Sequence, residues 1–238
     1  RRLNLIIRSL DAKMTDTSKS LWAMSEGHLI LVAGQSVYSS TAGVASGIMD
    51  LSSAYYRNIA GDDTSLDLIT TEQYEGIADK NENGEPSKLY LKKHATLASQ
   101  TMYLWPVKSS VTAGSEITGS DALNYTCVQG HTSLAVTKAI TGDSYSQFWK
   151  QTGSAGAAWV TATAYTNGEL IRYVYKRPLY DFDLASDNPD MPQEWSRYLV
   201  YRLASDMAGQ YGLNVEEQRE IRTKYLEAEA EIFPATQS

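Results

Sequence analysis

The sequence contains very few of the residues on which disulfides, metal sites and membrane spans depend. Its 238 residues include one cysteine, Cys127, and three histidines, His28, His94 and His131. A single cysteine excludes an internal disulfide and agrees with assembly in the cytoplasm, where thiols stay reduced. No apolar run approaches the roughly 20 residues that a membrane-spanning helix needs, so we expect no membrane partner.

Sequence motifs of catalysis and cofactor binding are also missing. The sequence has no H-E-x-x-H motif, no glycine-rich phosphate loop before a helix and no G-x-S-x-G motif. Cys127 and His131 have a spacing that suits two zinc ligands, but no second pair lies nearby. A small buried thiol explains Cys127 better than a nucleophile does. We therefore predict no catalytic residue, no metal, no cofactor and no enzymatic activity.

Carboxylates occur in pairs at Asp62–Asp63, Glu216–Glu217 and Asp181 with Asp183. Two carboxyl groups about 5–10 Å apart could hydrolyse a glycosidic bond, but neighbours in sequence do not establish that spacing. Turn formation, helix-dipole pairing and a solvated connector explain the three pairs. A cell-wall hydrolase therefore remains a less favoured alternative.

Acidic residues exceed basic ones, and the formal net charge of −7 argues against a protein that grips nucleic acid through a basic surface. One stretch runs against this trend, because Arg172, Lys176 and Arg177 are interleaved with Tyr173, Tyr175 and Tyr180. This pattern suits either a nucleic-acid platform or a strand with one solvated face, and we favour subunit contacts. We also expect one sheet surface to carry six basic residues: Lys88, Lys92, Lys93, Lys108, Arg172 and Lys176.

Tyrosine is unusually common, with 16 copies against 3 of phenylalanine. Tyrosine combines a large apolar ring with a polar tip, which suits surfaces that become buried against partners. Tyrosine also favours strands. The two interpretations remain open.

Helices are predicted near both ends of the chain. The clearest spans 190–212, with Asp190 as its cap, Gly212 at its end and a stripe of Trp195, Leu199, Leu203, Met207 and Tyr211. Residues 1–14 carry a matching stripe of Leu3, Ile7 and Leu10, and we expect the two helices to pack together. A last, highly charged helix begins at Asn214 and carries the stripe Ile221, Tyr225, Ala228 and Ile232.

Alternating residues predict strands in the middle of the chain. Residues 88–92 and 101–107 look like paired strands, and 169–176 is expected to pair with 101–107. Between them, residues 109–167 are rich in glycine, serine, threonine and alanine, which predicts a β-rich insert at the tip of a hairpin. The predicted fold class is α+β: a helical bundle of N- and C-terminal helices packed with a small antiparallel β-sheet, plus the insert. The predicted domains are 1–108 with 168–212, 109–167, and 213–238.

The order of several short motifs resembles a known family. They are Leu3-Asn4-Leu5-Ile6-Ile7, Gly34-Gln35-Ser36-Val37-Tyr38, the set Tyr74, Ile77 and Lys80, Gly84-Glu85-Pro86, Met102-Tyr103-Leu104-Trp105-Pro106, Arg177-Pro178-Leu179-Tyr180-Asp181-Phe182 and Met191-Pro192-Gln193-Glu194-Trp195. Together they resemble the head-to-tail adaptor (head completion, tail accessory) proteins of short-tailed bacteriophages. The resemblance covers 1–108 and 168–233, whereas the insert replaces a short loop of that family.

The resemblance implies a structural virion protein at the head–tail junction, assembled in the host cytoplasm. Such subunits form a dodecameric ring below the portal protein, extend the channel through which double-stranded DNA passes without specific contacts, help retain packaged DNA and bind a downstream tail or nozzle protein. It also implies that the last helix docks on the portal, and we assign the docking to Ile221, Tyr225, Ala228 and Ile232.

The insert resembles small carbohydrate-binding modules found in phage structural proteins. Its candidate glycan-binding rings are Trp149, Trp159 and Tyr165. The alternative, which we favour for most of them, is that these rings form the core of the insert, because a module this small needs large residues to fold. A carbohydrate-binding tail or surface protein is therefore the second hypothesis for function.

Overall fold

The structure is a computed structural model, and it describes residues 2–13, 23–96, 99–119, 121–133, 145–152, 156–179 and 191–233. The chain divides into two compact units. The first combines Arg1–Met24 with Pro178–Ser238 and is called the helical unit; the second, Ser25–Arg177, is called the β unit. The division differs in position from the predicted domain boundaries, and the stretch 109–167 lies inside the β unit.

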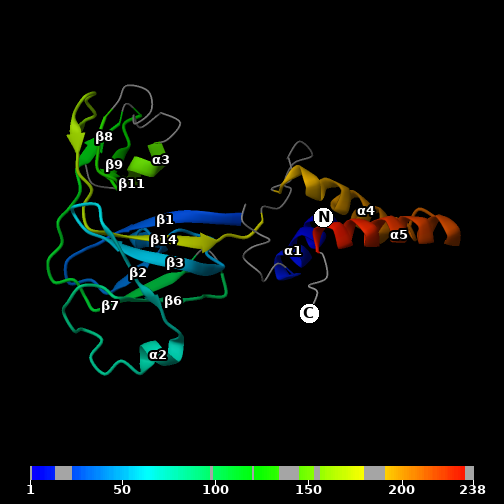
Figure 1. Ribbon diagram of the computed structural model, residues 1–238, viewed down its shortest axis with the longest axis horizontal. Helices are drawn as coiled ribbons and strands as arrows, with labels where there is room; N and C mark the ends of the chain where they lie inside the picture. Colours follow the sequence, from blue (N-terminus) through cyan, green and yellow to red (C-terminus); the bar gives the residue numbers. More distant parts are fainter. Residues whose placement is uncertain are drawn as a thin grey trace. The chain divides into compact units, whose positions relative to one another are not determined.

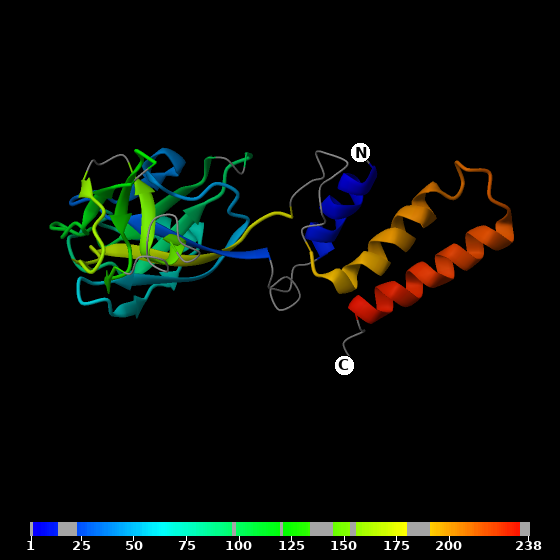
Figure 2. The same cartoon turned by 90° about the horizontal axis from the view of Figure 1, so that it is seen from above.

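The helical unit consists of α1 (Arg2–Lys13), the short 3-10 helix η5 (Gln193–Trp195), α4 (Ser196–Met207) and α5 (Val215–Ile232). Figure 2 shows α4 and α5 side by side, joined by the turn after Ala208. The expected packing of the first helix is confirmed, because Ile7, Leu10, Trp195 and Leu199 share one buried cluster. Arg2 of α1 also donates a hydrogen bond to the backbone oxygen of Asp206 at 2.8 Å.

Local capping sets the start of α5. The Asn214 side chain accepts a hydrogen bond from the Glu217 N–H at 2.9 Å, and the Glu217 carboxylate accepts one from the Asn214 N–H at 2.9 Å. This reciprocal pair satisfies two N–H groups that a helix leaves without partners. The predicted cap is therefore confirmed. Asp190, the predicted cap of the preceding helix, lies outside the described residues, and Gly212 adopts φ +67° in the turn beyond α4.

Two four-stranded sheets form the body of the β unit (Figure 1). The first has the order β1 (Met24–Ile30), β14 (Leu170–Lys176), β3 (Asp50–Arg57), β4 (Asp63–Ser65). The second has the order β2 (Val37–Ser39), β7 (Thr101–Trp105), β6 (Lys88–Lys92), β5 (Asp67–Leu68). A 3-10 turn, η3 (Ser40–Ala42), follows β2, and a short helix, α2 (Thr71–Glu75), follows β5.

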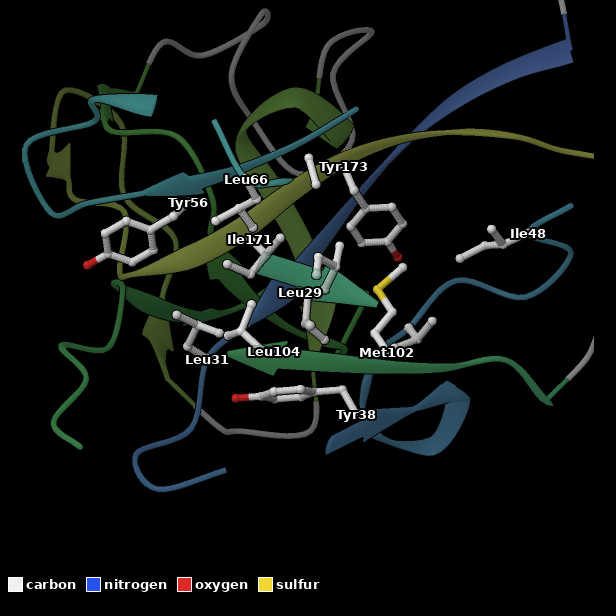
Figure 3. Close-up of a cluster of buried hydrophobic side chains, with 13 residues drawn as sticks. Leu29, Leu31, Tyr38, Ile48, Tyr56, Leu66, Met102, Leu104, Ile171 and Tyr173 are labelled. Atoms are coloured by element: carbon white, nitrogen blue, oxygen red, sulfur yellow. The ribbon is translucent and has the colours of Figure 1, made fainter. Parts of the chain in front are cut away.

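Side chains from both sheets meet in one core, which Figure 3 shows. Tyr173 and Ile171 of β14 belong to the same cluster as Met102 and Leu104 of β7. The ring of Tyr173 packs so closely on Gly27 that a Cβ there would lie 2.4 Å from it. The Tyr173 hydroxyl accepts a hydrogen bond from the Ala45 N–H at 2.9 Å. Burial raises the pKa of Tyr173 to about 12, so the ring stays neutral in this core.

The stretch 109–167 contributes sheets and a core of its own. A four-stranded sheet has the order β11 (Trp149–Thr152), β9 (Asn124–Cys127), β8 (Glu116–Thr118), β12 (Ala157–Ala158). A second pair joins β10 (His131–Thr132) to β13 (Ala164–Tyr165), and the helical turn α3 (Tyr145–Phe148) precedes β11. We call the segment from Ser109 to Asn167 the insert module.

The structure corrects the predicted fold class. The expected helical bundle packed with one small antiparallel sheet is wrong: the described residues form four sheets, and the N- and C-terminal helices belong to a different compact unit from these sheets. The pairing of 88–92 with 101–107 is confirmed as β6 with β7.

The predicted pairing of 169–176 with 101–107 is wrong, because β14 pairs with β3, in the other sheet. The insert module therefore does not lie at a hairpin tip. Along the chain, the module connects β7, in the second sheet, to β14, in the first sheet. For the same reason the six basic residues do not share one surface: Lys88 and Lys92 lie on β6, whereas Arg172 and Lys176 lie on β14.

Candidate functional site

The aromatic residues predicted to bind glycan form the core of the insert module. Trp149 is 2% exposed and Tyr165 is 8% exposed, and their rings meet edge to face with centroids 4.9 Å apart. The Tyr165 hydroxyl accepts a hydrogen bond from the Val160 N–H at 2.9 Å. Trp159 packs on this cluster and is partly buried. Because sugar rings stack on exposed aromatic faces, Trp149 and Tyr165 cannot supply a platform in this arrangement.

The cysteine and histidine of the insert module also belong to this core. Cys127 is fully buried, and its Sγ lies 3.1 Å from the backbone oxygen of Gln129, to which the thiol donates. Burial raises the pKa of the Cys127 thiol to about 12, which removes the thiolate that a nucleophile requires. His131 Nδ1 lies 2.8 Å from the same Gln129 oxygen. Among the described residues, no group of three or more His, Cys, Asp or Glu could hold a metal ion.

The paired carboxylates are used for structure. Asp63 accepts two hydrogen bonds of 2.7 Å from Arg57, and Arg172 lies 3.3 Å from the same carboxylate. The Arg57 hydrogen bonds hold the pKa of Asp63 below its ordinary value. Glu216 and Glu217 lie in the first turn of α5, where the helix dipole favours negative charge. Asp181 and Asp183 lie outside the described residues. The two described pairs therefore have structural roles, as the sequence suggested.

The basic and aromatic residues of β14 do not form an exposed nucleic-acid platform. Tyr173 and Lys176 are buried, at 0% and 8% exposure. Arg172 is held by the Glu26 carboxylate, with hydrogen bonds of 2.7 and 2.9 Å. The same guanidinium lies 3.3 Å from Asp63, and a guanidinium paired with two carboxylates offers little free charge to a phosphate backbone. Tyr180, the last ring of the pattern, lies outside the described residues.

A buried charged network joins the two ends of the insert module to the body of the β unit. Lys108 Nζ lies 2.8 Å from Glu169 Oε1 and donates to the Tyr56 hydroxyl at 3.0 Å. The other Glu169 oxygen accepts a hydrogen bond from the Thr112 N–H at 2.8 Å, and the Tyr56 hydroxyl donates to Glu169. Burial alone would raise the pKa of Glu169, but these donors bring it below its ordinary value.

Three further side chains, Arg57, Lys150 and Asn167, hold the insert module against the body of the β unit. Asn167 donates to the backbone oxygen of Asn58 at 2.7 Å, and Arg57 donates to the oxygen of Val128 at 3.3 Å. Lys150 of β11 donates to the backbone oxygens of His28 in β1 and of Gly43, the latter at 2.7 Å. These contacts join the module to the rest of the β unit, and they were not predicted from the sequence. The sequence did contain one indication of these contacts: Lys108 and Glu169 are charged residues at the two ends of a stretch that has few charges.

The residues predicted to dock on the portal lie within the helical unit. Tyr225 and Ala228 are buried, at 7% and 0% exposure, and Ile232 packs on the same cluster. Ile221, nearer the turn between α4 and α5, is partly buried. Arg202 donates to the Tyr225 hydroxyl at 3.0 Å and thereby holds α5 against α4. A partner can reach α5 most directly through its other faces.

The helical unit exposes apolar side chains on α1, on α4, on α5 and in the turn between α4 and α5. Five large ones belong to the helical unit: Leu5 (61% exposed), Val200 (63%), Tyr211 (72%), Val215 (64%) and Leu226 (50%). Tyr211 and Val215 flank the turn between α4 and α5. Single exposed apolar residues are common on proteins, but four on three helices and a fifth in the turn between α4 and α5 make the helical unit a candidate interaction surface. The sequence predicted Tyr211 on the core stripe of the helix 190–212, with Val200 widening that stripe, and both predictions are wrong because both side chains are exposed. Leu5, Val215 and Leu226 lie off the predicted stripes.

Comparison with known proteins gives no independent assignment. No protein-family model matches the chain, and no curated protein matches it significantly. In the part of the chain that the structure describes, no helix is both long and apolar enough to cross a membrane.

Proposed function

We propose that the chain is a subunit of a head-to-tail adaptor ring in a short-tailed bacteriophage. In this role it is a structural virion protein and not an enzyme. It joins the portal to the tail, extends the DNA channel and helps retain the packaged genome. The motif order described above supports the family, and the candidate interaction surface of the helical unit carries the proposal.

The exposed apolar side chains support an assembly role because the chain itself leaves them uncovered. Val200 on α4, Val215 and Leu226 on α5, and Tyr211 in the turn between these helices are each at least half exposed. Burial of each such side chain in an interface contributes roughly 1 kcal/mol or more. In a twelve-membered ring seated on a portal, we assign this surface to the portal and to neighbouring subunits.

The hydrogen bonds and ion pairs within the β unit support the same role. A ring that lines a DNA channel must keep its shape as the genome passes, and the insert module is fixed by the Lys108–Glu169 network and by Lys150. We place the β unit toward the downstream tail or nozzle protein. The burial of Trp149 and Tyr165 disfavours the alternative of a carbohydrate-binding protein acting through these rings.

Electron microscopy of the full chain mixed with the portal protein of the same virus tests the proposal. We expect rings of twelve subunits on the portal. Tyr211→Ser combined with Val215→Ser should abolish docking while the circular dichroism spectrum is retained. The matched control is Ile59→Ser combined with Val160→Ser, which removes two apolar side chains that are also more than half exposed, at 57% and 54%, from the β unit. Absence of any ring, or equal docking by both double variants, would contradict the proposal.

A further inference from the structure

The net charge of the chain is concentrated in one short segment. Residues 61–86 contain eight acidic residues and one basic residue, Lys80, whereas the rest of the chain contains 20 acidic and 20 basic residues. The whole formal charge of −7 therefore belongs to this segment, which forms β4, β5, α2 and the loop before β6. Such a concentration produces a local negative potential that attracts cationic partners.

A hollow of about 850 Å³ lies in the middle of this segment. The ring of Trp105 and the stem of Lys88 line one side, and the Lys88 ammonium lies 4.8 Å from the ring centroid. Leu68, Ile77 and Ala78 add apolar lining, and Leu68 is 38% exposed. Three exposed carboxylates complete the lining: Asp67, Asp79 and Glu82.

The walls of the hollow are held in place before any partner binds. The Trp105 indole N–H donates to the backbone oxygen of Asp79 at 2.9 Å, which fixes the loop beside the ring. Tyr74 of α2 packs on Tyr90 and Tyr103 of the sheet, with ring centroids 5.1 and 5.0 Å apart. The Thr70 side chain caps α2 through Gln73. Because these groups are already ordered, a ligand would lose little binding energy in ordering them.

The carboxylates themselves remain available. Within the described part of the chain, Asp67, Asp79 and Glu82 form no ion pair. No three acidic or histidine side chains of the described residues lie close enough to share a metal ion. The negative charge is therefore spread along a hollow that also has apolar lining, which suits several cationic groups attached to one apolar body.

We infer that this hollow binds a basic, amphipathic segment of a partner protein. Lysine or arginine side chains of the segment meet Asp67, Asp79 and Glu82, and an apolar side chain enters between Leu68, Ile77 and Trp105. DNA is repelled from the same surface by its charge. The inference goes beyond the adaptor proposal and does not depend on it, because the surface belongs to the β unit alone.

Binding of a labelled short peptide that alternates lysine and leucine, measured by fluorescence anisotropy on the full chain, tests the inference. We expect saturable binding that weakens with salt, and NMR shifts at the Trp105 indole and at Leu68. Asp67→Asn combined with Glu82→Gln should weaken binding about fivefold, as the loss of two exposed charge pairs implies. The control, Glu216→Gln combined with Glu220→Gln, changes the net charge equally in the helical unit, which contributes nothing to the lining of the hollow, and should leave the affinity unchanged.

Three outcomes would overturn the inference. The first is equal weakening by both double variants, which would indicate a general charge effect. The second is equal binding of a peptide that alternates glutamate and leucine, which would indicate non-specific apolar contact. The third is equally tight binding of spermidine, which carries amines without leucine side chains and would identify a small polycation as the occupant.

Discussion

The Lys108 ammonium lies 2.8 Å from the Glu169 carboxylate, and this pair ties the chain entering the insert module to the chain leaving it. The two residues are 61 positions apart in the sequence, and they flank the insert module at its two ends. Lys108 also lies 3.8 Å from Glu85, whose side chain is 74% exposed. Lys108 therefore has one buried carboxylate partner, Glu169, and one exposed partner, Glu85. The contributions of these two partners to stability can be compared directly.

Glu169→Gln should destabilise the chain by about 3 kcal/mol, because it leaves the Lys108 ammonium without its buried partner. Glu85→Gln removes the exposed partner of the same lysine and should cost less than about 1 kcal/mol. Urea unfolding followed by tryptophan fluorescence measures both. Equal costs for the two variants would show that the buried pair does not stabilise the base of the module.

Helix caps and strand pairing show what the sequence could predict about the fold and what it could not. Caps are local, so Asn214 was identified as the start of α5 from a few neighbouring residues. Strand pairing is not local. The alternation in 169–176 identifies a strand but carries no information on its neighbour, and both 50–57 and 101–105 offer suitable partners. The sequence analysis chose the wrong one and therefore placed the insert module on a hairpin.

Burial within a small module is equally invisible in the sequence. Trp149 and Tyr165 lie in a polar, glycine-rich stretch that suggests exposed rings, but β9, β11 and β13 bring them together around Cys127. The same limit applies to Tyr225 and Ala228. Their stripe correctly identifies an apolar face of α5, whereas only the position of α4 reveals that this face is covered within the chain.

Glu26 should titrate far below an ordinary glutamate. The His28 hydrogen bond and then the Arg172 hydrogen bonds lower the pKa of Glu26 from 4.5 to about 2. The stability that this carboxylate contributes is therefore fully present above about pH 4.5 and is lost as the pH falls toward 2. Because its side chain is 40% exposed, we expect the contribution to be below about 1 kcal/mol.

NMR titration of the Glu26 carboxyl carbon measures this pKa directly. In His28→Ala the pKa should rise but stay below 4.5, because Arg172 remains. His94→Ala removes a histidine whose ring contacts Thr101 instead, at 3.1 Å, and should leave Glu26 unchanged. The same titration curve in the native chain and in His28→Ala would contradict the assignment.

Two glycines should respond in opposite ways to alanine. A Cβ on Gly27 would lie 2.4 Å from the buried Tyr173 ring, so Gly27→Ala should cost about 1–3 kcal/mol by overpacking. Nothing lies within 4 Å of a Cβ on Gly209, where alanine should be neutral or stabilise by up to about 1 kcal/mol. Thermal unfolding measures both changes. A harmless Gly27→Ala would mean that the Tyr173 ring can move away at little cost.

Lys150 should make the stability of the chain rise at alkaline pH. Burial lowers the pKa of Lys150 from 10.5 to about 8, so between these values the folded chain has already lost a proton that the unfolded chain still binds. Stability therefore rises as the pH increases from 8 to 10.5, by about 1–3 kcal/mol. The neutral amine still has two N–H groups for the backbone oxygens of His28 and Gly43, so deprotonation does not break the contact.

Comparison with Lys150→Met isolates this effect from other groups that titrate in the same range. The stability of the native chain relative to the variant should increase between pH 7.5 and 10.5. Urea unfolding at several pH values gives this difference. A constant difference would show that the Lys150 ammonium is well solvated, and that the contact between β11 and β1 is open to water.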